Sequence, residues 1–377
     1  MMNEADRTAQ KGDRLLSIDA LRGFDMFWIV GGDQLARALA AWSRSGAGRA
    51  VGQQFHHAEW QGFRFYDLIF PLFLFLVGTV LPFSLAKYQA QSRGAVYGRI
   101  ARRTALLFAL GLICNGALQL EWSNLRVAGV LQRIAICYGI AAVISLNAST
   151  RTLVLIASAL LLGYWVVLDQ VAAPGGMPGD YTPAGNLVGW VDRHYLPGKI
   201  MKAYYGHGDN EGLLSTVPAV VTALLGVLAG RWLRSDRQPW TKVAGLAGAG
   251  LLALGLGAVW GERFPVIKIL WTSSFVLVAG GFSLLLLAAF YAVIDVLRWR
   301  RWAFFFVVIG ANAITIYVVP RFVDFRKMAQ FFLGGLYRLA GEHVSADFQS
   351  VLMAAGILAA EWLFLLYLYR NRIFLRV

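Results

Sequence analysis

The sequence predicts an all-α protein that crosses a membrane many times, and two observations carry this prediction. Hydrophobic residues make up 58% of the 377 residues and charged residues only 15%, whereas a soluble domain is about half apolar and a quarter charged. Apolar runs close to the ~20 residues that cross a bilayer as a helix also recur along almost the whole chain. We therefore expect a polytopic bundle of transmembrane helices.

Ten of these runs are expected to be transmembrane helices. They cover residues 18–42, 66–87, 103–120, 127–147, 152–171, 212–231, 241–260, 270–294, 302–320 and 351–370. The first run is the least regular, because it carries Arg22, Asp25, Asp33 and Arg37. No internal repeat is visible along the chain.

The distribution of basic residues predicts the orientation. The formal net charge is +14, and Lys and Arg are concentrated in the short loops and tails that share one side of the membrane. Because this bias marks the cytoplasmic side, we expect residues 1–17 to be a cytoplasmic tail, 18–377 to be the membrane domain, and both termini to lie inside. The basic excess then follows from topology and does not indicate nucleic-acid binding. No cleavable signal is expected.

Polar clusters gather at the outer ends of several predicted helices. His56, His57, Glu59 and Arg64 come just before the run 66–87. The other clusters on the same side contain Asn124, Arg126, Asp209, Asn210, Glu211, Lys268 and Trp271. Histidine, carboxylate, amide and guanidinium groups that converge on one face predict a site.

Each of these clusters also has a simpler structural explanation. A histidine at the mouth of a span can be only an interfacial residue, and Trp60 and Trp271 can be aromatic-belt anchors. Asp209 or Asn210 can cap the helix that follows them, with Glu211 at its positive end.

Several ionisable residues are expected inside or beside the hydrocarbon. They are Asp25, Asp33, Arg133 and Glu361. Such residues are costly there and indicate function by default, with a structural ion pair as the alternative. Arg14 and Arg22, at the inner side, suit the phosphates of a nucleotide, although they can also be ordinary positive-inside residues.

Two long outer loops are expected, at 172–211 and 321–350. The second contains the amphipathic piece FRKMAQFFLGGLYRLA, which is expected to lie on the membrane surface or to cap a cavity.

Six motifs in this order resemble one known family. They are RLLSIDALRGFDMFWIVGGD, HAEWQGFRFYDLIFPLFLFLVG, NLRVAGVLQRIAICY, DNEGLLSTVPAVVTALLGVLAG, KILWTSSFVL and GANAITIYV. Together they resemble the heparan-α-glucosaminide N-acetyltransferase family and its bacterial NagX-type relatives. The absence of the animal enzyme's N-terminal outer domain and first span implies a bacterial form, in the inner membrane.

The resemblance implies that the acetyl group of cytosolic acetyl-CoA moves to the amine of glucosamine, or of a glucosamine-terminated saccharide, on the far side. The matching catalytic histidine is His57, with Trp60 and Gly62 at the same offsets, and not His56. The animal enzyme has an Asn shortly before this histidine, whereas this sequence has Asp33, across a longer loop. A homodimer in the lipid bilayer is also implied, without a metal.

The chemistry of the residues agrees with this resemblance. A glucosamine amine must lose a proton before it attacks a thioester, and a neutral imidazole with a pKa of about 6.5 suits that task. Asp33 or Asp67 is expected to fix its tautomer; an acetyl-imidazole intermediate on His57 is the alternative. The residues expected to bind cofactor are Arg14, Arg22 and Arg133. Those expected to bind the sugar are Trp60, Asn124, Arg126, Asp209, Asn210, Glu211, Lys268 and Trp271.

The competing functional class is a proton-coupled transporter of sugars or other small molecules. Intramembrane Asp, Glu and Arg residues would fit such a carrier. Against it, the sequence shows no inverted repeat and no pair of broken spans in corresponding positions. A purely structural membrane partner would leave the buried charges unexplained.

Overall fold

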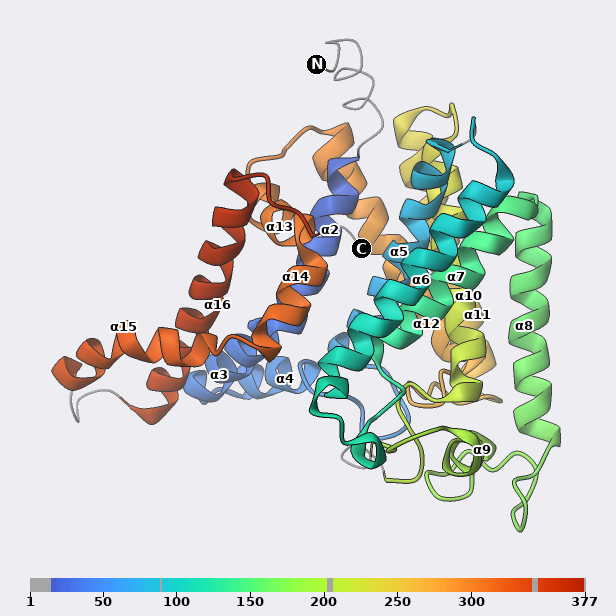
Figure 1. Ribbon diagram of the computed structural model, residues 1–377, viewed down its shortest axis with the longest axis horizontal. Helices are drawn as coiled ribbons and strands as arrows, with labels where there is room; N and C mark the ends of the chain where they lie inside the picture. Colours follow the sequence, from blue (N-terminus) through green and yellow to red (C-terminus); the bar gives the residue numbers. More distant parts are fainter. Residues whose placement is uncertain (1–14, 89, 202–205, 341–344, 376–377) are drawn as a thin grey trace. The chain divides into compact units, whose positions relative to one another are not determined.

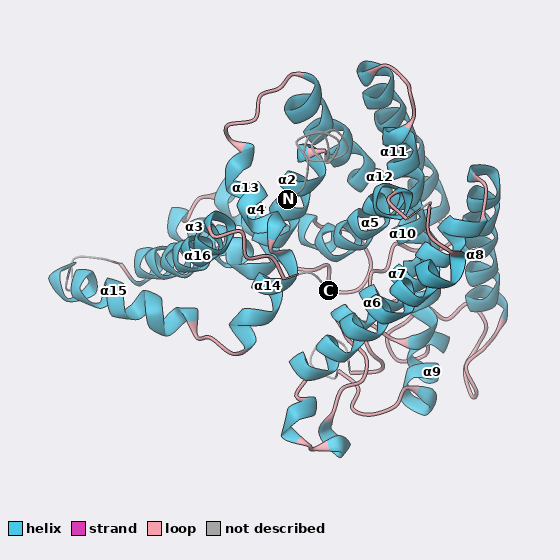
Figure 2. Cartoon of the chain, turned by 45° about the horizontal axis from the view of Figure 1, so that its top comes forward, coloured by secondary structure: helices cyan, strands magenta, loops and turns pink. Residues whose placement is uncertain are grey.

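The computed structural model describes residues 15–88, 90–201, 206–340 and 345–375. Over these residues the chain is helical, with two isolated β-bridges and no strand (Figure 2). The α-helices are α2 (Leu16–Phe27), α3 (Asp33–Ser43), α4 (Gly46–Gln54), α5 (Phe65–Ala86), α6 (Arg93–Cys114), α7 (Val130–Asn147), α8 (Thr150–Gln170), α9 (Leu187–Tyr195), α10 (Leu213–Arg234), α11 (Pro239–Gly261), α12 (Ser273–Phe290), α13 (Ala303–Ala311), α14 (Ala313–Val318), α15 (Phe325–Ala340) and α16 (Ala346–Arg370). The all-α prediction is confirmed for this part of the chain.

Seven helices of the described residues are long and apolar enough to cross a membrane. An eighth span is formed if α13 and the helical segment Ala313–Arg321, which are bent by 73° at Asn312, count as one. A multi-pass membrane protein is therefore confirmed, whereas ten spans and cytoplasmic termini stay predictions.

Besides the bend within the run 302–320, two further expected spans differ from what was predicted. The run 18–42 is broken: α2 ends at Phe27, a π-helical turn follows at Trp28–Gly32, and α3 begins at Asp33. Gly31 lies at the break with φ 147°, a backbone conformation that favours glycine. The run expected at 103–120 belongs to α6, which starts ten residues earlier and carries three arginines in its middle: Arg99, Arg102 and Arg103.

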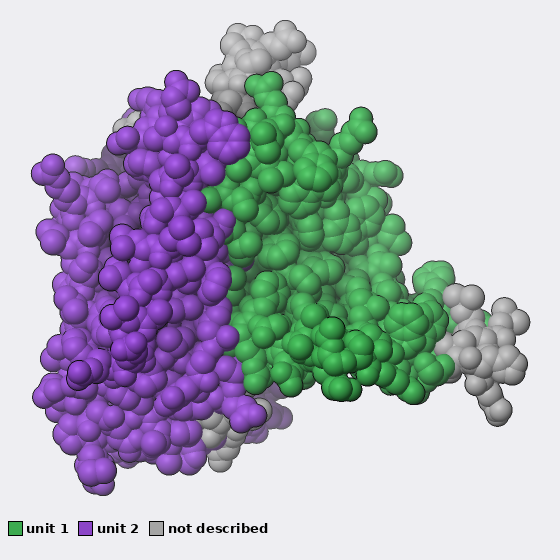
Figure 3. Space-filling model, turned by 180° about the vertical axis from the view of Figure 1, so that it is seen from behind, with its two compact units in different colours: residues 1–57, 64–69, 286–376 green, residues 58–63, 70–285, 377 purple. Residues whose placement is uncertain are grey.

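The contacts of the chain group it into two compact units, coloured separately in Figure 3. Unit 1 takes in the described residues of 1–57, 64–69 and 286–376, and unit 2 those of 58–63 and 70–285. The chain passes from one unit to the other within α5 and within α12. A single domain over 18–377 stays a prediction.

Unit 1 is built around the close packing of α2 on α13 (Figure 1). A Cβ at Gly23 would lie 1.7 Å from the carbonyl oxygen of Phe306, so only glycine permits this approach. Helix α16 packs against α3 and against α15. The expected amphipathic piece is α15, which buries Phe325 and Ala329 and exposes Phe331 and Phe332.

Unit 2 is a bundle whose loops meet at one end. Helix α10 packs on α7 and α8, and Gly226 lets it approach the backbone of α5 at Phe75. At the loop end, one buried apolar cluster joins α8, α9 and the segment before α12. Its members are Tyr164, Leu168, Val188, Phe264, Ile267, Ile269 and Leu270. The side chain of Trp60 packs against this cluster, so segments far apart in the sequence converge there.

Candidate active site

The ring of His57 is held by a buried carboxylate in unit 1. The Nδ1 atom of His57 lies 2.6 Å from Oδ1 of Asp67. The side chain of Asp67 is fully buried, whereas that of His57 is 26% exposed. His56, its neighbour, is exposed. The structure therefore distinguishes the two adjacent histidines in the way that the motif spacing predicts.

The start of α5 explains why Asp67 reaches this position. Helix α5 begins at Phe65, so Asp67 is its third residue, and Oδ2 of Asp67 accepts a hydrogen bond from the backbone N–H of Arg64 at 3.0 Å. A carboxylate at this position reaches back to cap the first turn. The guanidinium of Arg64 donates to the carbonyl oxygen of His57 at 2.9 Å. Arg64 therefore links the first turn of α5 to the backbone of His57.

The pairing with Asp67 fixes the tautomer of the neutral ring. An ionised carboxylate can only accept hydrogen bonds, so Nδ1 of His57 carries the proton. The lone pair of the neutral imidazole is then on Nε2, which is the arrangement of a general base oriented by a carboxylate. Of the two carboxylates expected to orient His57, Asp67 is the one that contacts Nδ1 of the imidazole.

Asp33, the other expected partner, bonds elsewhere. It is buried, and its Oδ2 lies 2.6 Å from Nη2 of Arg37 in the same helix. The hydroxyl of Tyr66 interacts with Asp33, and the ring centres of Tyr66 and His57 lie 4.8 Å apart. Of the two alternatives expected to orient His57, the carboxylate of Asp67 contacts the ring, whereas that of Asp33 pairs with Arg37.

A second cluster of charges lies at the loop end of unit 2. The Nε atom of Arg126 donates to Asp209 at 2.9 Å, and Nη2 bonds both Asp209 and Glu211. Burial alone would raise the pKa of Asp209, but its hydrogen bonds and the charge of Arg126 hold that pKa below its usual value. Burial opposes the charge of Arg126 too, but the two carboxylates raise its pKa. Asp209 and Arg126 therefore each stabilise the charged form of the other.

Asp192, which the sequence reasoning missed, organises the same region. Its carboxylate accepts from the backbone N–H of Asp209 at 3.1 Å and of Leu213 at 2.9 Å. Leu213 is the first residue of α10, so Asp192 caps that helix in place of Asp209 or Asn210. Burial raises the pKa of Asp192 against these two bonds. No local sequence motif indicates this role, because the residue that caps α10 comes from a different helix, α9.

Arg133 is buried in unit 2 at 1% exposure. Its Nη2 donates to the hydroxyl of Ser215 and to the carbonyl oxygen of Gly212. Its guanidinium lies 5.0 Å from the ring centre of Trp271, which is itself 1% exposed and donates to Thr222. Trp271 is therefore covered within unit 2 rather than open at a membrane interface. Within the described residues, Nε and Nη1 of Arg133 have no hydrogen-bond partner.

The other residues expected to bind sugar have varied surroundings. Trp60 donates to the carbonyl oxygen of Tyr181 at 2.8 Å, and this bond ties its loop to unit 2. Asn124 is exposed and donates to Glu121 at 3.3 Å. Lys268 is half-buried. The Oδ1 atom of Asn210 is buried and has no partner among the described residues.

Of the three arginines expected to bind cofactor, Arg133 has donors left over. Arg22 donates to the carbonyl oxygen of Gly310 at 2.8 Å and pairs with Asp19 at 2.7 Å, so it links α2 to α13. Arg14 lies outside the described residues. A cluster of side chains suited to a metal ion is not found in the part of the chain that the structure describes.

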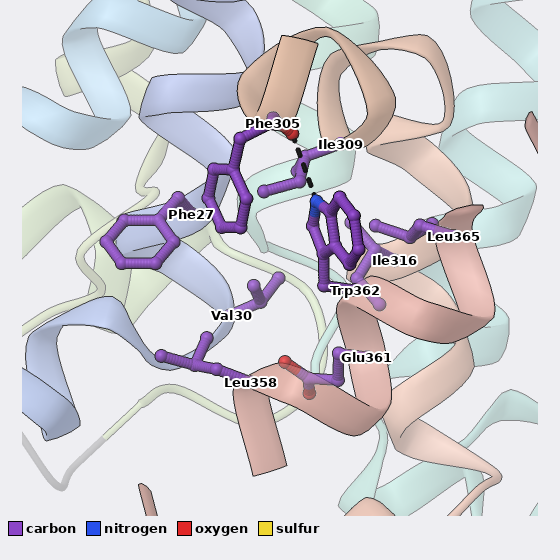
Figure 4. Close-up of a pocket in the computed structure, with 9 residues that line it drawn as sticks. All are labelled: Phe27, Val30, Phe305, Ile309, Ile316, Leu358, Glu361, Trp362 and Leu365. Atoms are coloured by element: carbon purple, nitrogen blue, oxygen red, sulfur yellow. Dashed lines mark hydrogen bonds between the residues drawn. The ribbon is translucent and has the colours of Figure 1, made fainter. Parts of the chain in front are cut away.

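In two carboxylates of unit 1, at least one oxygen has no hydrogen-bond partner among the described residues. Both oxygens of Asp25 are of this kind, and so is Oε2 of Glu361. Glu361 faces a pocket with about 220 Å³ of empty space, part of it open to the outside (Figure 4). The other lining residues are Phe27, Val30, Phe305, Ile309, Ile316, Leu358, Trp362 and Leu365.

Comparisons with known proteins identify relatives of the chain. Residues 14–122 match a family described as a domain of unknown function, DUF5009. The human heparan-α-glucosaminide N-acetyltransferase is 28% identical over 367 residues, which is 81% of this chain and 52% of the human protein. The mouse protein of the same name is 26% identical over 427 residues, which is 97% of this chain and 61% of the mouse protein.

The chain thus spans between half and two thirds of the length of these relatives. The similarity covers most of the chain. The comparisons confirm the resemblance seen in the motifs: the chain is similar in sequence to the heparan-α-glucosaminide N-acetyltransferases.

Proposed function

We propose that the chain is a transmembrane N-acetyltransferase, which moves the acetyl group of acetyl-CoA to the amine of glucosamine or of a glucosamine-terminated saccharide. The observation that supports this most is the pairing of His57 with the buried Asp67 at 2.6 Å. It prepares a neutral imidazole to take up a proton at Nε2. The names of the relatives supply the type of reaction and the acceptor.

In the direct reaction, the ammonium group of the acceptor gives a proton to Nε2 of His57. The amine nitrogen then attacks the thioester carbonyl; the new C–N bond forms, the C–S bond breaks, and the leaving thiolate takes up the proton that the attacking nitrogen gives up. In the alternative, Nε2 attacks the thioester first and the thiolate leaves; the amine then attacks the acetyl-imidazole, so that the acetyl group passes to the nitrogen and Nε2 is freed. Asp67 stabilises the positive charge on the ring in both cases.

The charged groups of unit 2 would bind the substrates. Asp209 and Glu211 both pair with Arg126, and carboxylate groups suit the hydroxyls and the ammonium group of an amino sugar. Arg133 has donors to spare, which suits an anionic or carbonyl group of the donor. We further propose that the donor comes from the cytoplasm and the acceptor from the periplasm of a bacterial inner membrane.

The test compares His57→Ala with His56→Ala in purified protein at equal concentration. Loss of a general base should lower the rate of acetyl transfer to glucosamine by about 10²–10⁴-fold. His56→Ala, an exposed neighbour that is not in the motif, is the matched control and should stay near the wild-type rate. A His57→Ala variant with near-normal turnover would refute the assignment.

A further inference from the structure

The imidazole of His57 is contacted by two consecutive residues of α5. Asp67 bonds Nδ1, and the ring of Tyr66 lies against the imidazole, with ring centres 4.8 Å apart and planes tilted by 36°. These two contacts constrain different motions. A single hydrogen bond to Nδ1 leaves the ring free to swing about the line between donor and acceptor, whereas a packed aromatic face resists that swing.

Tyr66 is itself held at its hydroxyl. The hydroxyl interacts with the carboxylate of Asp33, which is only 5% exposed. Asp33 pairs with Arg37 at 2.6 Å, and Nη1 of Arg37 donates to the carbonyl oxygen of Phe55 at 3.1 Å. Phe55 precedes His57 by two residues. The series of contacts therefore starts at the backbone just before His57 and returns to the ring of His57.

The arrangement is charged and partly buried: Asp33 is buried, whereas 33% of the Arg37 side chain is exposed. Arg37 and Asp33 form a charge-assisted bond, which is shorter and stronger than a neutral one. Asp33 also stands at the first residue of α3, directly after the π-helical turn with Gly31. That turn sets where α3 begins, so it fixes the place from which Asp33 reaches Tyr66.

We propose that Tyr66, held by Asp33 and Arg37, is a positioning residue that sets the tilt of the His57 imidazole and so the direction of its Nε2 lone pair. This inference rests on the proposed function of His57 as the base or nucleophile. It gives Asp33 a part in the site that differs from the direct contact expected from the sequence. Misplacement of a reacting group by about 1 Å can cost about 10²-fold in rate.

The experiment measures kcat and KM for acetyl transfer to glucosamine in three variants. Tyr66→Leu removes the ring contact and should lower kcat about 10²-fold. Tyr66→Phe keeps the ring but loses the bond to Asp33, and Asp33→Asn weakens the same bond; each should lower kcat about 10-fold. Because none of these residues is assigned to substrate binding, KM for both substrates should change less than about 3-fold.

The double variant Tyr66→Phe with Asp33→Asn tests whether the two residues act through one link. If they do, it should be no slower than the slower single variant, because two changes to one interaction are not additive. The control is Tyr97→Phe, which removes the bond of an exposed tyrosine to Asn147 in α7 and should keep wild-type kcat.

Three outcomes decide the proposal. Wild-type kcat in Tyr66→Leu and Tyr66→Phe, with His57→Ala inactive, would overturn the positioning role and leave the proposed function intact. Full activity in His57→Ala would overturn both. A lower yield of folded protein in the Tyr66 variants, with unchanged kcat in the folded fraction, would mean that the contact serves folding alone, and would also overturn it.

Discussion

At the scale of single residues, Arg126 decides the charge of its surroundings. Its side chain is 21% exposed, whereas Asp209 is fully buried and Glu211 nearly so. Without a nearby cation, burial would push Asp209 toward the protonated form. The backbone N–H groups of Met201 and Glu211 add two further bonds to Asp209. The guanidinium and these backbone groups together favour the ionised form of a fully buried carboxylate.

The variant Arg126→Gln should be strongly destabilised, because it leaves two carboxylates buried without their cation. The loss is expected to be on the order of 3 kcal/mol, and it should appear as a lower Tm in detergent. The control, Arg263→Gln, changes an exposed arginine and should leave the Tm within a degree or two. An unchanged Tm in Arg126→Gln would contradict the importance of the cluster.

The same variant should respond to pH in a defined direction. In the wild type the pKa of Asp209 is lowered, so the stability from this group is present above its unfolded pKa of about 3.9 and is lost only as pH falls through the lower folded value. In Arg126→Gln, burial raises the pKa of Asp209, and protonation relieves the cost. The difference in Tm between variant and wild type should therefore shrink between pH 7.5 and pH 5.

At the scale of elements, the first predicted span shows what sequence patterns can and cannot supply. The long apolar runs predicted α5, α10 and α16 well, because their period and length depend only on neighbouring residues. The break in 18–42 lies at Gly31, which has a φ of 147°. A hydropathy pattern carries no information about such a turn. The start of α6 at Arg93 was also missed. The first turns of this helix are charged, so hydropathy alone places its start too late.

In the candidate site, too, some features depend on neighbouring residues and others on contacts between distant elements. The motif spacing around His57 and Trp60 favoured His57 over His56 and offered Asp67 as a partner, and the structure pairs His57 with Asp67. The contacts of Tyr66 and Asp192 depend on side chains that meet across different elements, and no spacing in the sequence reports this. Asp33 was the other candidate partner, but its carboxylate pairs with Arg37, one helical turn further along the same helix.

A substitution at Gly31 should show that the break in the first span is built into the fold. Gly31→Ala places a side chain at a φ that it rarely adopts, at a cost on the order of 1–3 kcal/mol, and should lower the Tm. Gly98→Ala is the matched control: nothing lies within 4 Å of a Cβ there, and alanine favours the helix by ~0.5–1 kcal/mol. An equal or higher Tm in Gly31→Ala would mean that the turn is not required.

At the scale of the whole molecule, the proposal implies a reaction with a direction across the membrane. The described residues contain seven or eight helices able to span it, and the basic loops predict cytoplasmic termini. In sealed vesicles of known orientation, acetyl-CoA supplied on the cytoplasmic face and glucosamine on the other should give N-acetylglucosamine on the far side. Fast turnover with both substrates confined to the periplasmic face, and none across the membrane, would contradict this.

Asp67 has a further consequence for how such a protein can change over generations. One oxygen of its carboxylate holds His57, and the other caps the first turn of α5. A lineage that abandons acetyl transfer but keeps the folded protein for another purpose can lose His57 freely. It cannot lose Asp67 without also weakening the start of a long helix. Among descendants that have become pseudoenzymes, the histidine should therefore disappear first, and the aspartate should outlast the chemistry that it once served.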